Sequence, residues 1–128
     1  MLNLTQLTPP TSALIIEDDP KLADIFEIAL QRIGVETEIA PDGQLALNRL
    51  AVSSPDLVIL DIHLPHVSGV EILRQIRKDD RLKATRVVIV TADVTYVRTM
   101  QSEVDMIMTK PVGFREFVNG VYASLGYH

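Results

Sequence analysis

Residues 57–69, LVILDIHLPHVSG, contain the transition that decides the fold. Residues 57–60 form a continuous apolar run, which has the length and composition of a fully buried strand. The run ends at Asp61, and Pro65 follows four positions later, so the strand gives way to a loop. A buried strand that brings a carboxylate to its own end predicts a functional edge of a sheet.

Four other segments have the pattern of strands. Residues 13–16 and 87–90 are continuous apolar runs, residues 106–108 form a shorter one, and residues 35–39 alternate apolar and polar positions. Helical patterns separate the strands, which indicates right-handed crossovers and a parallel sheet. Apolar strands belong inside such a sheet, and the alternating strand belongs at an edge. We therefore expect an α/β fold of the flavodoxin-like, doubly wound type, with strand order 2-1-3-4-5 and helices on both faces.

Helix boundaries follow from caps and spacing. Asp19 and Pro20 mark the start of the first helix, and Gly34 marks its end. The second helix is expected over about 42–52, and the third from a capping box that begins at Ser68 to about residue 79. Residues 94–103 form only a weak, polar helical segment. Apolar residues of the first helix fall at helical spacing: Leu22, Ile25, Phe26, Ala29 and Ile33. The last helix is expected to bury an apolar stripe formed by Phe114, Phe117, Val118, Val121 and Leu125.

Composition restricts the class of protein. The 128 residues are 47% hydrophobic, which suits one domain with a real core. No apolar run approaches membrane-spanning length, and the absence of cysteine excludes disulfides and cysteine-bound zinc. These features indicate a cytoplasmic protein. The net charge of −5 and the lack of a basic stripe argue against direct nucleic-acid binding. Residues 1–12 are interpreted as a flexible leader to a single domain over 13–128.

Polar residues collect at the expected carboxyl ends of the strands. The first strand ends in Glu17 and Asp18, the third in Asp61, the fourth in Thr91 and the fifth in Lys110. Ligands of open α/β sheets bind at this edge, near the switch point between the first and third strands. Oxygen ligands select a hard cation, and Mg²⁺ is the natural choice. A carboxylate beside Mg²⁺, a lysine and a hydroxyl has the groups needed to accept a phosphoryl group.

Four motifs in this order resemble the receiver domain of two-component response regulators. They are IIEDD at 15–19, VILDIHLPHVSG at 58–69, VIVTAD at 88–93 and TKP at 109–111. The likeness covers residues 13–126. Each motif is weak alone, whereas the ordered set at strand ends is specific.

The resemblance implies a role for each site residue. Asp61 resembles the phosphoacceptor, and Lys110 resembles the lysine that contacts the phosphoryl group. Thr91 resembles the switch hydroxyl. Glu17 and Asp18 resemble the acidic pair that holds Mg²⁺, and the backbone carbonyl of His63 completes the protein ligands.

Two features depart from the family pattern. Ile107 stands where an aromatic residue usually turns inward on activation. The interval from Thr91 to Lys110 is shorter than usual, so the fourth helix should be short, displaced or poorly ordered. Both departures fall on the output face. His63 and Asp93 flank the phosphoryl site at positions that tune phosphate loss in this family.

The expected function is a phosphorylation-driven signalling switch. A histidine kinase or phosphotransfer protein would donate the phosphoryl group, and a downstream protein would read the result. The chain ends at His128, so we expect signalling by protein binding or by a homodimer through the face of the fourth helical segment, fifth strand and last helix. Such a domain is no enzyme beyond self-phosphorylation from donors and slow self-dephosphorylation.

Other functions are open to test. A phosphorylation-independent interaction module would keep the pocket without using it to switch. A phosphatase of the haloacid dehalogenase type needs a DxD pair that Glu17-Asp18-Asp19 does not provide, and no glycine-rich loop is present to bind a nucleotide. Each site residue also has a plain structural alternative, such as a solvated strand-end carboxylate or a helix cap. For His63 and His66, solvated loop positions are favoured over a transition-metal site.

Overall fold

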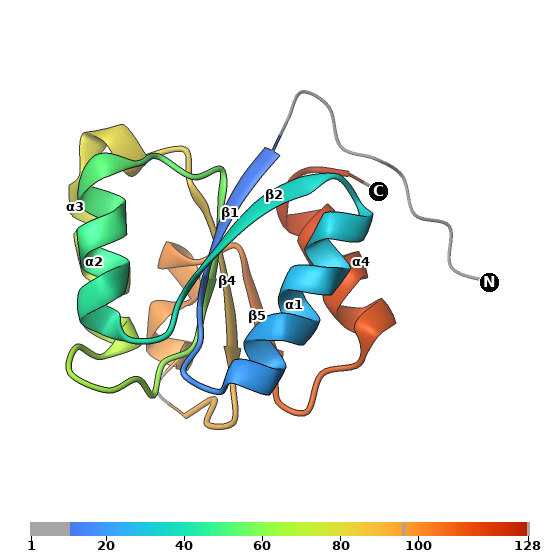
Figure 1. Ribbon diagram of the computed structural model, residues 1–128. Helices are drawn as coiled ribbons and strands as arrows, with labels where there is room; N and C mark the ends of the chain where they lie inside the picture. The colour runs from blue at the N-terminus through green and yellow to red at the C-terminus, as the bar shows by residue number, and fades with distance from the viewer. Residues whose placement is uncertain (1–10, 96, 128) are drawn as a thin grey trace.

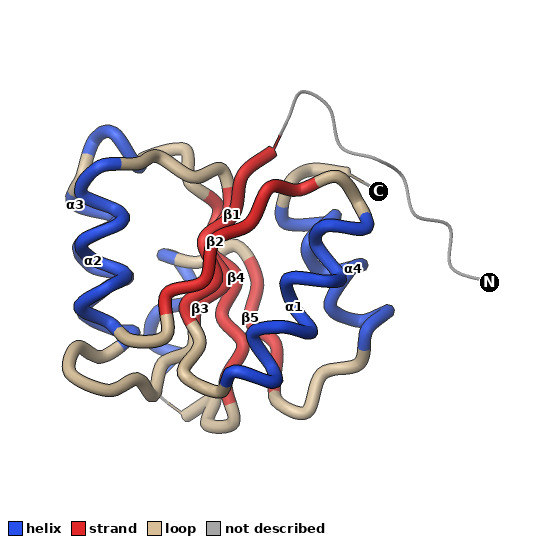
Figure 2. The backbone as a smooth tube through the Cα atoms, in the orientation of Figure 1, coloured by secondary structure: helices blue, strands red, loops and turns tan. Residues whose placement is uncertain are grey.

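A five-stranded parallel sheet forms the centre of the computed structural model, in the order β2-β1-β3-β4-β5 (Figure 2). The structure describes residues 11–95 and 97–127. The predicted strand order is confirmed, and the alternating strand lies at an edge as expected. The strands are β1 (Thr11–Ile16), β2 (Val35–Ala40), β3 (Leu57–Leu60), β4 (Arg86–Thr91) and β5 (Met106–Thr109).

Helices cover both faces of the sheet. Figure 1 shows α1 (Pro20–Arg32) and α4 (Phe114–Ser124) on one side, and α2 (Gly43–Val52) and α3 (Gly69–Lys78) on the other. Two short 3₁₀ helices, η1 (Asp80–Leu82) and η2 (Val97–Glu103), complete the described elements. This arrangement leaves the carboxyl ends of the strands to be closed by loops alone.

Side-chain caps fix the helix starts where the sequence predicts them. The carboxylate of Asp19 accepts a hydrogen bond from the Lys21 amide at 3.0 Å, at the beginning of α1. Asp42 accepts one from the Leu45 amide in α2, and the Ser68 hydroxyl caps α3 in the same way. Each cap satisfies an amide that a helix start would otherwise leave unpaired.

Two apolar clusters form the core, one on each face of the sheet. On the α1–α4 face, the rings of Phe26 and Phe117 stack with their centroids 4.5 Å apart. On the other face, Ile72, Leu73 and Ile76 of α3 are fully buried against the sheet. Burial on both faces explains why β1, β3 and β4 are apolar almost throughout.

One residue assigned to the buried stripe of the last helix lies at the surface. Phe114 of α4 is 36% exposed, so this assignment was wrong. Ile25, which shares the apolar spacing of α1, is also exposed, at 53%. Phe114 is the first residue of α4, and the guanidinium of Arg32 covers its ring at 5.6 Å. Helical spacing identifies the apolar face of a helix, but it does not show how much of that face the neighbouring elements cover.

The start of the domain also differs from the expectation. Thr11 and Ser12, assigned to the leader, form the beginning of β1 and pair with β2. The rest of the predicted leader, 1–10, lies outside the described residues. Among the residues that the structure describes, no helix combines the length and apolar character needed to cross a bilayer.

The segment between β4 and β5 is short, as predicted. It folds as the 3₁₀ helix η2, which buries Val97 and Met100 toward the sheet. Ile107 in β5 is half-buried and packs against the same cluster. A 3₁₀ helix has poorer hydrogen-bond geometry than an α-helix, so η2 replaces a regular helix with a less favourable one.

Candidate functional site

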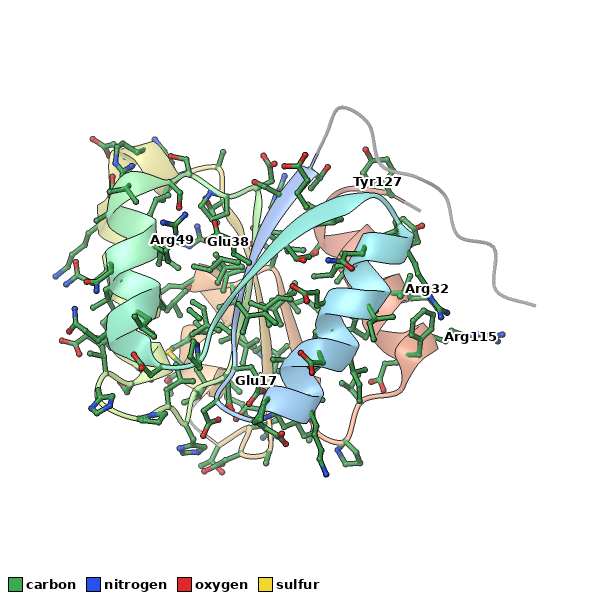
Figure 3. All side chains as sticks on the ribbon, viewed as in Figure 1. Glu17, Arg32, Glu38, Arg49, Arg115 and Tyr127 are labelled. Atoms are coloured by element: carbon green, nitrogen blue, oxygen red, sulfur yellow. The ribbon has the colours of Figure 1, made fainter. Side chains whose placement is uncertain are left out.

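Strand register brings Glu17 and Asp61 to the same edge of the sheet. β1 and β3 are neighbours in which Ile16 pairs with Leu60, and the next residue of each strand carries a carboxylate. The amide of Asp61 donates to the carbonyl of Ile16 at 3.1 Å, which extends the pairing by one step. Figure 3 shows Glu17 just before the start of α1, at the carboxyl end of the sheet. Adjacent parallel strands therefore place the two carboxylates together.

Asp18 joins these two residues in an acidic cluster. Glu17, Asp18 and Asp61 each contribute one carboxylate oxygen, and the three oxygens lie within 4.8 Å of one another. Glu17 and Asp61 are only 2% and 5% exposed, whereas Asp18 is exposed. The predicted convergence of these carboxylates is confirmed. The cluster therefore combines two buried carboxylates with one that solvent reaches.

Lys110 supplies the positive charge of the site. Its Nζ lies 2.8 Å from Glu17 Oε1 and 3.0 Å from Asp61 Oδ2. The Lys110 amide donates to the Thr91 carbonyl at 2.8 Å, which holds the residue just beyond the paired ends of β4 and β5. We call Glu17, Asp18, Asp61 and Lys110 the acidic pocket.

The acidic pocket shifts the proton affinities of two members. Burial raises the pKa of Glu17 and the negative charge of Asp61 adds to this, while hydrogen bonds from Lys110 and Asp19 act in the opposite direction. Burial would lower the pKa of Lys110, but its hydrogen bonds and ion pairs with Glu17 and Asp61 raise it overall. Lys110 therefore stays protonated at neutral pH. Its single positive charge faces two buried carboxyl groups, those of Glu17 and Asp61, and cannot balance both when they are ionised.

The composition of the acidic pocket fits a divalent cation. Three carboxylates face one lysine, which leaves an excess of negative charge in a largely buried site. All of the clustered ligand atoms are oxygens, which suit Mg²⁺. The three oxygens lie within 4.8 Å of one another, close enough for one hard cation to be held directly or through a bridging water.

Two loops approach each other beside the acidic pocket. Thr91 is fully buried, and its hydroxyl accepts a hydrogen bond from the Asp93 amide at 3.3 Å. Asp93 Oδ2 lies 3.7 Å from His63 Nε2, and the His63 amide donates to Asp61 Oδ1 at 3.2 Å. The sequence singled out His63 and Asp93 separately as neighbours of the site. Their contact with each other depends on loop geometry and was not predicted.

The hydrogen bonds of Asp93 have an electrostatic consequence. Its carboxylate accepts from the Thr95 amide at 2.9 Å, and this bond together with His63 lowers the pKa of Asp93. Asp93 is therefore ionised at neutral pH. A negative charge stands next to His63 at the edge of the site.

Comparison with known proteins identifies the family. Residues 13–122 match the model of the response regulator receiver domain. The chain belongs to this family. Receiver domains are phosphoacceptor switches rather than true enzymes, and they generally act with histidine kinases.

Individual relatives of this receiver domain agree with that assignment. The transcriptional regulatory protein TrcR of Mycobacterium tuberculosis is 36% identical over 110 residues, which are 85% of this chain and 43% of TrcR. This receiver thus spans less than half the length of that curated relative.

Solved structures of receiver domains share the fold. The response regulator TrrA of Thermotoga maritima, solved in complex with Mg²⁺–BeF, has a TM-score of 0.78 and 30% identity, covering 89% of this chain and 98% of that one. A CheY-like receiver domain protein of Methanospirillum hungatei has a TM-score of 0.83 and 25% identity, covering 91% and 94%. The acidic cluster of this receiver is thus that of a typical Mg²⁺ site in a two-component system.

Proposed function

We propose that this receiver domain accepts a phosphoryl group on Asp61 from a histidine kinase or a phosphotransfer protein. The observation that supports this most strongly is the environment of Asp61. Its carboxylate is 5% exposed, lies 3.0 Å from Lys110 Nζ, and shares a cluster with two further carboxylates. A nucleophile with a fixed cation beside it and an opening toward a donor meets the needs of phosphoryl transfer.

The two oxygens of Asp61 are held by different partners. Oδ1 accepts the His63 amide hydrogen, and Oδ2 faces Lys110. In the transfer, a carboxylate oxygen forms a bond to phosphorus while the phosphorus–nitrogen bond of a phosphohistidine donor breaks. The electron pair of that bond stays on the imidazole nitrogen, which takes up a proton. The product is an acyl phosphate, whose added negative charge Lys110 stabilises and whose oxygens the Thr91 hydroxyl is proposed to contact.

Mg²⁺ is the proposed cofactor of this site. Asp18, Asp61 and the backbone carbonyl of His63 would hold it, with Glu17 as the buried member of the acidic pair. When bound, the ion supplies positive charge to the transferring phosphoryl oxygens. The complex of TrrA with Mg²⁺–BeF, a receiver of similar fold, supports the assignment.

The proposed output is protein binding by a cytoplasmic signalling domain that begins at β1. A downstream protein, or a second copy bound through the face of η2, β5 and α4, would distinguish the phosphorylated state. We propose no direct contact of this domain with nucleic acid or membrane, in keeping with its net charge of −5. Slow self-dephosphorylation would reset the switch.

The test is the intact mass of the full chain after incubation with Mg²⁺ and phosphoramidate. Wild type should gain one phosphoryl group, and Asp61→Asn should gain none. Asp24→Asn, the same chemical change at an exposed position of α1, is the matched control and should behave as wild type. If wild type gains nothing with excess Mg²⁺, the proposed function is wrong.

A second candidate is a phosphorylation-independent interaction module. It is favoured by η2, which replaces a regular helix on the output face, and by the half-buried Ile107 in place of a mobile aromatic residue. Hydrogen exchange over residues 97–109 separates the two candidates. A switch predicts altered exchange in phosphorylated wild type, and the module predicts the same exchange as in Asp61→Asn.

A further inference from the structure

We propose that Gly43, the first residue of α2, is a positioning residue. Its close approach to Val67 sets how near to α2 the loop that carries Asp61 and His63 can lie. This inference rests on the proposed function, because it concerns the same metal and phosphoacceptor site. α2 contributes no side chain to the acidic pocket. Its contribution is a place where the loop can approach the helix without meeting a side chain.

The contact between Gly43 and the loop leaves no room for a methyl group. A Cβ at position 43 would overlap the carbonyl oxygen of Val67 and lie 2.7 Å from Val67 Cβ and 2.9 Å from its carbonyl carbon. Two of these three atoms belong to the backbone, so rotating a side chain cannot relieve the overlap. The Gly43 amide also points to this loop and donates to the Pro65 carbonyl at 3.4 Å. Gly43 is buried, which agrees with the loop covering the start of α2.

A second glycine closes the other side of the same loop. A Cβ at Gly69 would overlap the Asp61 carbonyl oxygen and lie 2.7 Å from Ile62 Cα. The Gly69 amide donates to the Ile62 carbonyl at 2.9 Å. The loop is therefore packed against glycine at both its beginning and its end.

The loop contains a tight turn. His66 has a positive φ of 70°, which costs energy for a residue with a side chain, and the Val67 amide donates to the Pro65 carbonyl at 2.9 Å. Because the turn from Pro65 to Val67 is held this tightly, a push at Val67 displaces the turn as a unit. That displacement reaches His63 and Asp61, the residues proposed to bind the metal and the phosphoryl group. Metal sites are sensitive to such shifts, since disturbing groups that orient the ligands typically costs 10–100-fold in affinity.

The experiment is a calorimetric titration of the full chain with Mg²⁺ alone, without any phosphodonor. Gly43→Ala should weaken Mg²⁺ binding by about tenfold. Gly113→Ala is one control, because no atom lies within 4 Å of its Cβ position and its φ of −77° suits any residue. Gly120→Ala is the other, because its Cβ would meet the flexible end of Met108 on the opposite face of the sheet. Both controls should bind Mg²⁺ within about twofold of wild type.

A double variant identifies which atoms matter. Val67→Ala removes the γ-methyl groups of Val67 but keeps its Cβ and its carbonyl group, the atoms that a Cβ at position 43 would meet. Gly43→Ala with Val67→Ala should therefore bind Mg²⁺ as weakly as Gly43→Ala alone. Full recovery in the double variant would contradict the proposal that the backbone of the loop is displaced.

Wild type offers a test that needs no substitution. Binding linkage is reciprocal, so Mg²⁺ should in turn hold the loop against α2. Exchange of the Gly43 amide, which donates to Pro65, should slow with Mg²⁺ more than exchange of the α4 amides. Equal slowing in both places, or Gly43→Ala binding within about twofold of wild type, would overturn the role of Gly43. If wild type binds no Mg²⁺ and gains no phosphoryl group, the proposed function fails as well.

Discussion

Two clusters of charged residues lie at opposite ends of the sheet, and they are built differently. The acidic pocket stands at the carboxyl ends of the strands. The second cluster, which we call the arginine cluster, consists of Arg77, Arg86 and Asp105 near the amino ends of β4 and β5. Both place charge where the protein excludes much of the solvent. They differ in how that charge is compensated.

The arginine cluster is tied to the backbone. Arg77 donates to the carbonyls of Glu103 at 2.8 Å and Thr85 at 2.9 Å, and it pairs with Asp105 at 3.4 Å. Asp105 accepts the amide hydrogen of Val87 at 2.8 Å. These bonds connect α3, the end of η2 and the starts of two strands. Charged groups that are satisfied in this way serve the fold.

The acidic pocket keeps an excess of charge. Each buried carboxylate accepts one backbone amide, and Lys110 alone among the described residues offers them a cationic side chain. Since the third carboxylate, on Asp18, is exposed, a further cation has a route of entry. The comparison shows that buried charge alone does not mark a functional site. Buried carboxylates in excess of their cationic partners, next to an exposed carboxylate, are what make the acidic pocket a candidate functional site.

The largest expected effect comes from the lysine of the acidic pocket. Lys110→Ala removes the fixed charge beside Asp61 Oδ2, and it should slow phosphoryl gain from phosphoramidate by about 100-fold or more. The measurement is the rate of mass gain under Mg²⁺ saturation. Lys83→Ala, an exposed lysine near the arginine cluster, should leave the rate unchanged. If Lys110→Ala slowed phosphoryl gain by less than about threefold, Lys110 would not be the group that stabilises the charge of the transferred phosphoryl group.

The arginine cluster should respond in stability instead. Arg77→Ala leaves two carbonyls without their donor and removes one of the partners of Asp105, so unfolding in urea should show a loss of about 2–3 kcal/mol. Arg86→Ala removes a more exposed ion pair and should cost less than about 1 kcal/mol. Folded Arg77→Ala should still gain a phosphoryl group. If it does not, the arginine cluster also affects phosphorylation in the acidic pocket, and the two clusters are not independent.

Removing one carboxylate from each cluster should change stability in opposite directions. Because burial raises the pKa of Glu17, ionised Glu17 opposes folding: the stability present below its unfolded pKa is lost as pH rises through the raised pKa. Without Mg²⁺ at neutral pH, Glu17→Gln should therefore melt above wild type. Asp105→Asn should melt below it, by about 1–3 kcal/mol in unfolding free energy. If both substitutions changed the melting temperature in the same direction, the two clusters would not differ in the way described.

The smallest expected effect is on the pH dependence of Mg²⁺ binding. A proton on Glu17 competes with the cation, and the raised pKa means that this competition begins at a higher pH than for an ordinary glutamate. Mg²⁺ affinity should therefore decline as pH is lowered toward the acidic range, in a calorimetric titration series. Glu17→Gln should bind more weakly and should lack this part of the decline. The prediction would be contradicted if the Mg²⁺ affinity of wild type stayed constant as pH is lowered until the pH range in which ordinary carboxylates titrate.

The sequence predicted the acidic pocket better than the arginine cluster for a physical reason. Strand ends are local features, so the apolar runs before Glu17 and Asp61 were enough to bring both to one edge once the strand order was known. The helix caps at Asp19 and Ser68 were also local. Their confirmed positions follow from the same logic.

What the sequence did not predict depends on distant packing. Arg77 lies 26 positions before Glu103 and 28 before Asp105, and no spacing rule connects them. The close approach of Gly43 to Val67 is of the same kind, since each residue alone looks like part of an ordinary helix start or loop. The exposure of Ile25 and Phe114 depends on where neighbouring elements end.

The most direct measurement asks which carboxylate carries the phosphoryl group. Borohydride reduction converts an aspartyl phosphate to homoserine, and peptide mapping of the phosphorylated, reduced chain then locates it. The account predicts reduction at Asp61 alone, in a reaction that requires Mg²⁺. Reduction at the exposed Asp18, or at no aspartate although the intact mass has increased, would contradict it.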